Sequence, residues 1–226
     1  MSDTPTAVAA IARLASRAGL YEAFGHVSAR DGDDLVITPT SPLGAVKAED
    51  TVRIPLEEGA ESKPEWAKTA PLEIPMHAAV YLARPDLTGI VRTHSPAAVV
   101  LGARRQVPPL VHGLAGQAGD VTLIDYTDLF ATKVSGEQFA AALGDADCLL
   151  IRANGALATG ASLARAAVRA FYLEERCRVA IEAGPEAVEI TASELEPRSN
   201  WFEAETQRAW AWLSWRYGDD ELDLVP

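Results

Sequence analysis

Residues 71–96 read PLEIPMHAAVYLARPDLTGIVRTHSP, and this stretch decides how the chain is organised. Its apolar residues predict a helix over residues 75–83 that stops near Arg84-Pro85-Asp86. The β-rich run at residues 87–91 follows and predicts a buried strand. A helix that leads into a strand in this way is expected in an α/β or α+β domain.

Similar signals lie on both sides of this stretch. Thr4 can cap a helix that has Pro5 at its first position and stops at Gly19. The polar run at residues 57–68 predicts a mobile loop that buries nothing. The remaining predicted elements are strands at residues 35–37, 121–124 and 148–151, and helices at residues 135–143, 162–183 and 200–217. Together these elements predict a mixed sheet flanked by helices.

Composition and charge exclude several classes of protein. With 48% hydrophobic and 23% charged residues in 226, the chain is expected to be globular, not disordered or fibrous. The 20 Lys and Arg against 32 Asp and Glu give a net charge of −12, which argues against nucleic-acid and anionic-membrane partners. No apolar run is long enough to span a membrane and no basic leader is seen, so we expect a cytoplasmic location. Two cysteines, Cys148 and Cys177, cannot build a disulfide framework.

Three short strings place polar groups beside tight turns. The first is GHVSAR at residues 25–30, followed by ITPT at residues 37–40. The second is EIPMH at residues 73–77, followed by VRTHSP at residues 91–96, and the third is LIRANGALATG at residues 150–160. In order and spacing the three strings resemble the class II aldolase/adducin family, whose zinc lyases cleave or form carbon–carbon bonds beside a carbonyl.

The resemblance covers about residues 5–185 and implies an architecture. The expected fold is a three-layer α/β/α single domain over residues 1–226 with a central mixed or antiparallel sheet, completed by the Trp-rich C-terminal helix at residues 200–217. The resemblance also implies a homotetramer with the pocket between neighbouring subunits. PLVHGLAG at residues 109–116 and His26, where the sugar-phosphate aldolases carry Asn, are most similar to the decarboxylase branch of the family.

The metal site of the family is altered here. The resemblance implies three histidine ligands, and the matching positions hold Arg92, His94 and Asn154. A guanidinium or a carboxamide is a poor substitute for a neutral imidazole, so no metal cofactor is favoured, and weak binding of a divalent ion is the most we expect. Glu73 and His77 are four residues apart, however, and with His94 they could form a rebuilt two-His-one-carboxylate site suited to Fe(II). The alternative is that His77 is a hydrogen-bonded core histidine.

Arg92 is the most informative of these changes, because a fixed cation stands where a divalent metal would lie. A guanidinium can stabilise a developing oxyanion through paired hydrogen bonds. Glu73, which matches the family's catalytic carboxylate, would transfer the proton, while His94 and Asn154 would orient the substrate. These four residues form the predicted catalytic set.

Substrate recognition is predicted from the first string and its neighbours. Pro71, Leu72 and His26 replace groups that hold phosphate in the sugar-phosphate aldolases, and Pro71 has no N–H, so we expect a nonphosphorylated substrate. The candidate substrate-binding residues, each with a structural role as the alternative, are His26, Ser28, Arg30, Thr38 and His112.

These residues lead to two hypotheses of different kinds. The first is a metal-independent lyase that acts beside a carbonyl or carboxylate of a small acid, including aromatic and polyketide-like acids; decarboxylation is favoured over dehydration, isomerisation or cyclisation. The second is a noncatalytic, adducin-like scaffold in which Arg92 simply pairs with Glu73. A metal-dependent aldolase or oxygenase with a rebuilt site is a further alternative.

Overall fold

The computed structural model describes residues 3–21, 23–61, 66, 68–195 and 202–222. Across these ranges seven strands form one sheet in the order β3-β2-β1-β4-β7-β6-β5. Every neighbouring pair is antiparallel except β5 and β6, which run parallel. The strands are β1 (His26–Asp31), β2 (Asp34–Ile37), β3 (Val52–Pro55), β4 (Gly89–Thr93), β5 (Val121–Ile124), β6 (Cys148–Ile151) and β7 (Ala156–Gly160).

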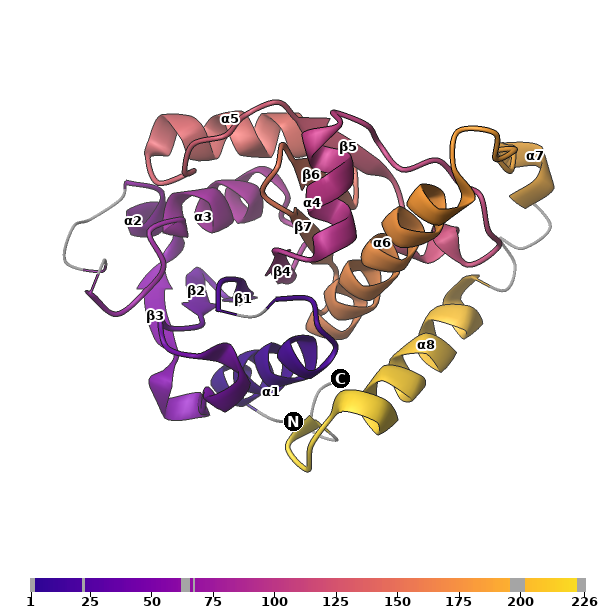
Figure 1. Cartoon of the computed structure of the whole chain (residues 1–226). Coiled ribbons are helices and arrows are strands. Elements are labelled where there is room, and N and C mark those ends of the chain that lie inside the picture. The colour runs from indigo at the N-terminus through magenta and orange to yellow at the C-terminus, as the bar shows by residue number, and fades with distance from the viewer. Residues whose placement is uncertain (1–2, 22, 62–65, 67, 196–201, 223–226) are drawn as a thin grey trace.

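Helices cover both faces of the sheet (Figure 1). They are α1 (Thr4–Arg17), α2 (Leu56–Ala60), α3 (Ile74–Ala83), α4 (Pro96–Ala103), α5 (Lys133–Leu143), α6 (Leu163–Ala183), α7 (Ala192–Leu195) and α8 (Phe202–Tyr217). Short 3-10 turns lie at η1 (Leu43–Ala45), η2 (Ala48–Asp50) and η4 (Ala115–Ala118).

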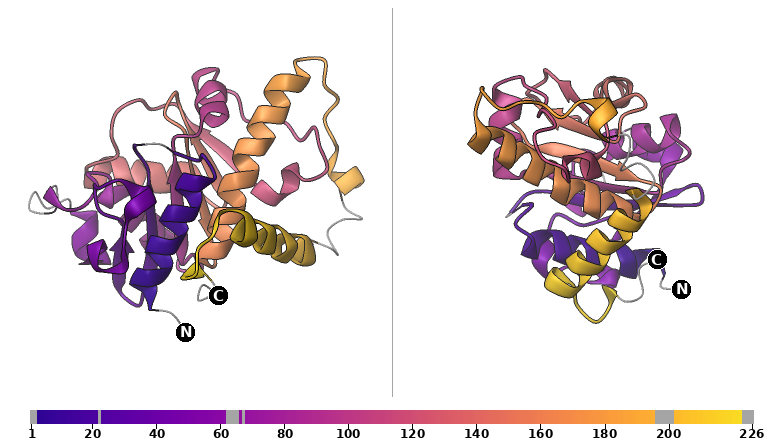
Figure 2. Two further views of the ribbon diagram at one scale, coloured as in Figure 1. Left: turned by 60° about the horizontal axis from the view of Figure 1, so that its bottom comes forward. Right: turned by 90° about the vertical axis from the view of Figure 1, so that its right-hand side faces the viewer.

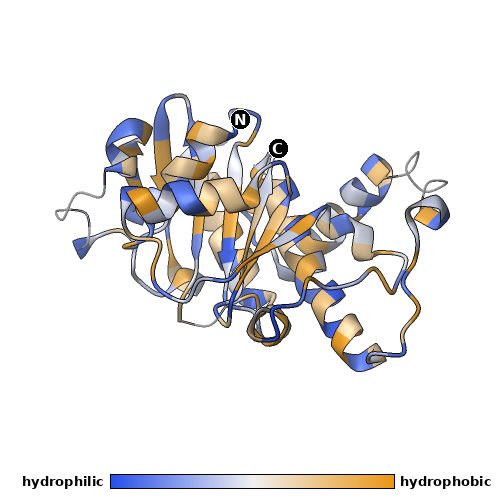
Figure 3. Cartoon of the chain, turned by 90° about the horizontal axis from the view of Figure 1, so that it is seen from above, coloured by the Kyte–Doolittle hydropathy of each residue, from blue (hydrophilic) through white to orange (hydrophobic). Residues whose placement is uncertain are grey.

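The core consists of two apolar clusters separated by the sheet. One contains residues of α1, α4, α6 and α8, and the other contains residues of α2, α3 and α5. Alternation along β4 divides its side chains between them, because Val91 joins the first cluster and Ile90 the second. Figure 2 shows the same arrangement from two further sides, and Figure 3 shows apolar residues along the strands and adjoining helix faces. The predicted three-layer α/β/α fold with a mixed sheet is confirmed.

Helix ends are set by local chemistry, and most were predicted. Helix α6 begins after Ser162, whose side chain accepts the N–H of Arg165, and ends at Gly184 with a φ of 75°. Helix α5 ends at Gly144 as predicted. At α1 the prediction was wrong by one residue: Asp3, not Thr4, is the cap, and its carboxylate accepts the N–H of Thr6 at 3.1 Å.

The predicted loop at residues 57–68 is wrong in its first part. Helix α2 occupies Leu56–Ala60, and Leu56, Gly59 and Ala60 are buried. The small side chains let α2 pack on α3, a tertiary contact that local polarity does not reveal. Residues 62–65 and 67 lie outside the described part of the chain.

Two polar or Gly-rich motifs form central strands. His26 follows a glycine in a string expected beside a tight turn, but it begins β1, which pairs with both β2 and β4. The third string contributes β7, the neighbour of β4 in the sheet. The predicted strand at residues 87–91 is shifted by two residues and becomes β4. These corrections place His26 directly opposite Arg92 in the sheet register.

The C-terminal helix packs on the first apolar cluster. Leu213 is fully buried, and Trp210 is partly buried against the cluster. Trp212 lies edge-on to Phe171 with 5.5 Å between ring centroids, whereas Trp215 is exposed. Packing therefore explains part of the Trp-rich helix; Trp201 lies outside the described residues. None of the described helices combines the length and apolar character needed to cross a membrane.

Candidate functional site

A pocket of about 340 Å³ lies where the sheet, the start of α3 and the turn between β6 and β7 meet. Four predicted site residues line it: His26, Glu73, His94 and Asn154. The other residues of its wall are Ala23, Phe24, Gly25, Pro39, Thr40, Ser41, Leu43, Pro71, Leu72 and Leu129. Segments from all three strings therefore converge on one concave site.

Glu73 occupies the first position before α3, where Pro75 suits the first turn of the helix. Glu73 is 5% exposed and lines the pocket. Its carboxylate therefore faces the pocket from a largely buried position. Oε2 lies 3.9 Å from both His26 Nδ1 and Arg92 Nε. Oε1 is buried and has no hydrogen-bond partner among the described residues. One carboxylate oxygen is thus left available to a ligand.

Arg92 lies in the middle of the sheet and is completely buried. Its Nη1 donates to the carbonyl oxygens of Thr93 and Ala156, the latter at 3.4 Å. Nε and Nη2 are buried without a hydrogen-bond partner among the described residues. Burial lowers the pKa of the guanidinium and the Glu73 carboxylate opposes this shift. The residue does not line the pocket; it lies behind the wall that Glu73 forms.

Desolvation makes this arrangement costly. A buried cation is ordinarily held by a close carboxylate and by hydrogen bonds to all its donors. A separation of 3.9 Å is beyond hydrogen-bond distance. Arg92 and Glu73 therefore attract one another without satisfying one another's polar atoms.

His94 and Asn154 meet across two different turns. His94 follows the end of β4, and Asn154 lies in the turn that joins β6 to β7. Gly155 permits this approach, because a Cβ there would lie 2.1 Å from the Thr93 carbonyl oxygen and 2.8 Å from His94 Cα. Its φ of 80° also favours glycine. The preceding Ala153 has a φ of 53°, so the strained residue of this turn lies directly before Asn154.

The pKa of His94 is lowered to about 4, chiefly by burial and then by the charge of Arg92, while a side-chain hydrogen bond with Asn154 acts in the opposite direction. Burial, with the nearby His77 and Arg92, also lowers the pKa of His26 well below its usual value. Both imidazoles are therefore neutral near pH 7 and can donate or accept one hydrogen bond at each ring nitrogen, according to tautomer.

A buried polar network lies beneath His26. The His77 and His26 ring centroids are 5.6 Å apart, and His77 Nδ1 is 2.8 Å from the Ser28 hydroxyl. The Tyr81 hydroxyl donates to the Ser28 carbonyl oxygen at 2.9 Å. His77 is therefore a buried histidine with a hydrogen bond to Ser28. Neither His77 nor Ser28 lines the pocket.

Besides Ser28, three more predicted substrate-binding residues lie outside the pocket wall. Arg30 donates to the Tyr81 carbonyl oxygen and lies over the Tyr81 ring. Thr38 is fully buried and its hydroxyl accepts the N–H of Val27. Burial lowers the pKa of His112; the charge of Glu175 opposes this shift, and the charges of Arg176 and Arg178 add to it. Within one chain, therefore, His112 does not join the other site residues.

The side chains present do not fit a family-type metal site. Among the described residues there is no group of three His, Cys, Asp or Glu side chains that could hold a metal ion. Glu73, His77 and His94 in particular do not form such a group. The Arg92 guanidinium offers only N–H donors where a ligand lone pair is needed.

Sequence reasoning missed the apolar mouth of the pocket. Phe24, Leu72 and Leu129 are large hydrophobic residues that are 74%, 53% and 46% exposed and line this same pocket. From the sequence, Leu72 indicates only the loss of a phosphate-binding group. A Phe before a glycine gives no clear functional signal in one sequence.

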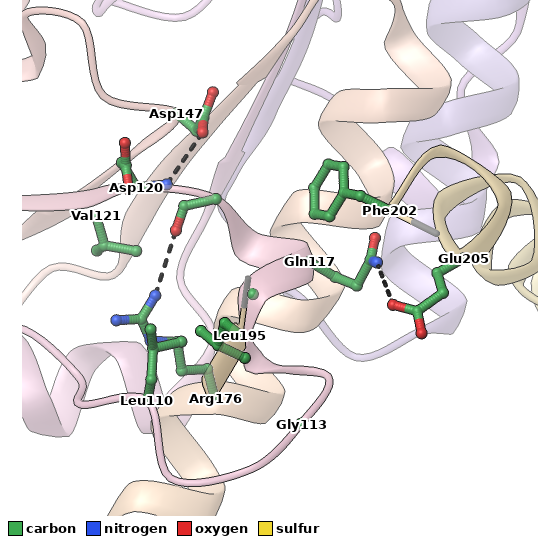
Figure 4. Close-up of a pocket in the computed structure, with 12 residues that line it drawn as sticks. Leu110, Gly113, Gln117, Asp120, Val121, Asp147, Arg176, Leu195, Phe202 and Glu205 are labelled. Carbon is green, nitrogen blue, oxygen red and sulfur yellow. Dashed lines mark hydrogen bonds between the residues drawn. The ribbon is translucent and has the colours of Figure 1, made fainter. Parts of the chain in front are cut away.

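A second, larger cavity of about 760 Å³ lies between η4, α6 and the start of α8 (Figure 4). Arg176 in its wall donates Nε to the Pro108 carbonyl and Nη1 to the Gly119 carbonyl, at 2.9 and 3.3 Å. Gln117 donates to Glu205 across the same cavity. These polar groups bind one another or the backbone. No residue of the three motif strings lines this cavity, but Leu110, Gly113 and Gly116 of the PLVHGLAG stretch do.

Comparisons with known proteins agree with this geometry. Residues 6–181 match the class II aldolase and adducin N-terminal domain. A 5-methylthioribulose-1-phosphate/5-deoxyribulose-1-phosphate aldolase of Rhodospirillum rubrum is 30% identical over 72% of this chain and 79% of its own length. A 3,4-dihydroxyphthalate decarboxylase of Terrabacter is 29% identical over 83% of this chain and 85% of its own.

Among solved structures, an aldolase II superfamily protein from Pseudomonas syringae superposes with a TM-score of 0.77 at 21% identity. The match covers 93% of this chain and 90% of that one, and at this identity it concerns the fold. The matched domain includes every catalytic candidate: Glu73, Arg92, His94 and Asn154. The chain belongs to the class II aldolase/adducin family.

Proposed function

We propose that the protein is a metal-independent lyase that acts beside a carbonyl or carboxylate of a small acid, with decarboxylation as the favoured reaction. In the proposed step, the bond to the departing carboxylate breaks and its electron pair passes to an adjacent carbonyl as an enolate. Carbon dioxide leaves, and Glu73, carrying a proton taken up from water, delivers that proton to the carbanionic carbon and returns to the carboxylate. His94 and Asn154 orient the substrate, and His26 contacts it from β1.

The unsatisfied guanidinium of Arg92 is the observation that carries this proposal. Two buried nitrogens without a partner lie beside a carboxylate that also has an unpartnered oxygen. An oxyanion at this position would satisfy donors that the protein leaves open. Preorganised donors of this kind each contribute about 2.7–4 kcal/mol to transition-state stabilisation.

The proposed contact requires one local movement. Arg92 is completely buried behind Glu73, so a substrate oxygen reaches it only when the Glu73 side chain turns aside. The 3.9 Å separation means that this rotation breaks no hydrogen bond between the two. Glu73 would then stand beside the substrate, where proton transfer needs it.

A noncatalytic scaffold is the second candidate, favoured by the zero exposure of Arg92. A pair kept only for stability would be expected to close to hydrogen-bond distance in a filled cavity. The open pocket and the unpartnered atoms argue instead for a ligand. Similarity to decarboxylases supports the enzymatic alternative.

A nonphosphorylated acid is the proposed substrate, since Pro71 and Leu72 line the pocket where phosphate would need N–H donors. Aromatic and polyketide-like acids belong to this class. The proposed assembly is a homotetramer in which His112 belongs to an interface between subunits. The proposed location is cytoplasmic, in agreement with two buried free thiols, and the whole chain is proposed to act as one domain.

Carbon dioxide release tests the proposal directly. Purified protein would be treated with a chelator and offered hydroxybenzoates and β-keto acids, with Glu73→Gln as the inactive control. We expect release by the parent that survives chelation and falls at least about a hundredfold in Glu73→Gln. Turnover that requires an added divalent cation would overturn the metal-independent mechanism.

A further inference from the structure

The mouth and the base of the pocket differ sharply in polarity. Phe24, Leu72 and Leu129 surround the mouth with exposed apolar surface, whereas Glu73, His94 and Asn154 lie deeper. Large exposed hydrophobic groups that gather at one concave site commonly mark a ligand-binding surface. A ligand that fills this pocket would therefore have one polar end and one apolar body.

Phe24 is held in position by its neighbours. Gly25, which follows it, has a φ of 152°, and a Cβ there would lie 2.6 Å from the Tyr21 ring. Tyr21 is itself buried, and its hydroxyl donates to the Ala12 carbonyl oxygen at 2.6 Å. The anchored tyrosine and the glycine together fix the backbone that presents Phe24.

The Phe24 ring continues the wall that His94 begins. Their ring centroids are 6.4 Å apart with 65° between the ring planes, which is an edge-on arrangement. A flat ring bound above His94 could pack against Phe24 while its polar substituent reached Asn154 and Glu73. A tetrahedral or strongly hydrated group would gain nothing from this surface.

The charges near the pocket limit the substrate further. Glu73 is the one Asp, Glu, Lys or Arg among the described lining residues, and Arg92 behind it supplies a single opposite charge. His26 and His94 are neutral near pH 7 because burial lowers the pKa of each. Glu73 and Arg92 together carry no net charge, so Arg92 compensates one negative charge of a bound acid when Glu73 holds the proton that it transfers. A second negative charge at the mouth would lie against leucine and proline side chains.

We propose that Phe24 is a specificity-determining residue that selects a planar, ring-containing acid with a single negative charge. The ring packs between Phe24, Leu72 and Leu129, and the acidic group enters the base of the pocket. This assignment rests on the proposed function only in placing the acid at the base. It separates this chain's substrate class from sugar phosphates, which carry two charges and no flat apolar face.

Binding of simple probes, measured by calorimetry, tests the assignment without knowledge of the natural substrate. The probes are benzoate, its nonplanar analogue cyclohexanecarboxylate, the dianion phthalate and inorganic phosphate. We expect benzoate to bind tightest, and Phe24→Ala to weaken it about five- to tenfold while Phe24→Tyr retains it. Val188→Ala, at an 87% exposed position outside the pocket wall, is the matched control.

Unchanged benzoate affinity in Phe24→Ala, or phthalate or phosphate binding as tight as benzoate, would overturn the assignment. So would the absence of any benzoate binding by the parent. Arg92→Met separates this inference from the proposed function. If Arg92→Met keeps benzoate affinity while Phe24→Ala loses it, the proposed role of Arg92 is wrong and that of Phe24 is supported. If Arg92→Met loses affinity while Phe24→Ala keeps it, only the proposed role of Phe24 is wrong.

Discussion

Arg92 and Arg176 are both buried arginines beside a cavity, yet their surroundings differ. Arg176 donates Nε and Nη1 to two backbone carbonyls, and none of its nitrogens is both buried and without a partner. Arg92 uses only Nη1 in this way and leaves Nε and Nη2 unpartnered among the described residues. The first pattern is that of a brace between α6 and a loop, and the second that of a site awaiting a ligand. Hydrogen-bond satisfaction separates the two roles where burial cannot.

Activity should respond to the two arginines in opposite ways. Arg92→Met is expected to lower kcat for carbon dioxide release about a hundred- to a thousandfold, because it removes the proposed oxyanion donors. Arg176→Met should leave kcat within about threefold of the parent, provided that the folded fraction is corrected by circular dichroism. Equal losses of kcat in the two variants would end the functional distinction.

Zinc binding tests whether the position of Arg92 still belongs to the ancestral ligand geometry. Arg92→His combined with Asn154→His would supply, with His94, three imidazoles and an open position. After dialysis we expect elemental analysis to rise from no retained zinc to about one per chain in the double variant, with Arg92→His alone as the control. No gain would mean that the three positions no longer converge, and tightly held metal in the parent would defeat the metal-free mechanism.

The free energy of unfolding should fall more in Arg176→Met than in Arg92→Met, the reverse of the order expected for kcat. Arg176→Met leaves the carbonyls of Pro108 and Gly119 without their donor, so we expect the free energy of unfolding to fall by about 2–3 kcal/mol. Arg92→Met is expected to cost less, because it also removes two unpartnered buried nitrogens. Urea denaturation at pH 7 measures both, and a larger loss in Arg92→Met would identify Arg92 as the structural brace.

The histidines beside Arg92 predict a dependence on pH. Burial, and then the charge of Arg92, lowers the pKa of His77 to about 3, against about 6.5 in an unfolded chain. The unfolded state therefore binds the extra proton as the pH falls below 6.5, and stability is lost down to about pH 3. For His77 the loss between pH 6.5 and 5 is about 2 kcal/mol.

Urea denaturation of His77→Gln across this pH interval tests the dependence. We expect a shallower fall in the free energy of unfolding than in the parent, with the remaining slope due largely to His26 and His94. Val188→Ala, which changes an exposed and non-titrating side chain, is the control and should keep the parental slope. Identical slopes for His77→Gln and the parent would show that His77 does not titrate as described.

The site could be predicted in part from the sequence. His26, Glu73, His94 and Asn154 lie in motif strings whose order resembles a known family, and the structure brings all four to one pocket. The motif strings did not predict how deeply each side chain is buried. Arg92 and His94 are two residues apart, but the strand ends between them, so one is buried in the sheet and the other reaches the pocket.

The features that could be predicted from the sequence are those that depend on residues close together in the chain. Ser162 and Gly184 delimit α6, apolar runs give β5 and β6, and the motif order gives the family. Tertiary structure alone decided that His26 begins a central strand, that α2 packs on α3, and that Phe24 faces the pocket of Glu73. The physical reason is that capping and propensity act within a few residues, whereas burial, strand pairing and the satisfaction of Arg92 depend on segments distant in the chain.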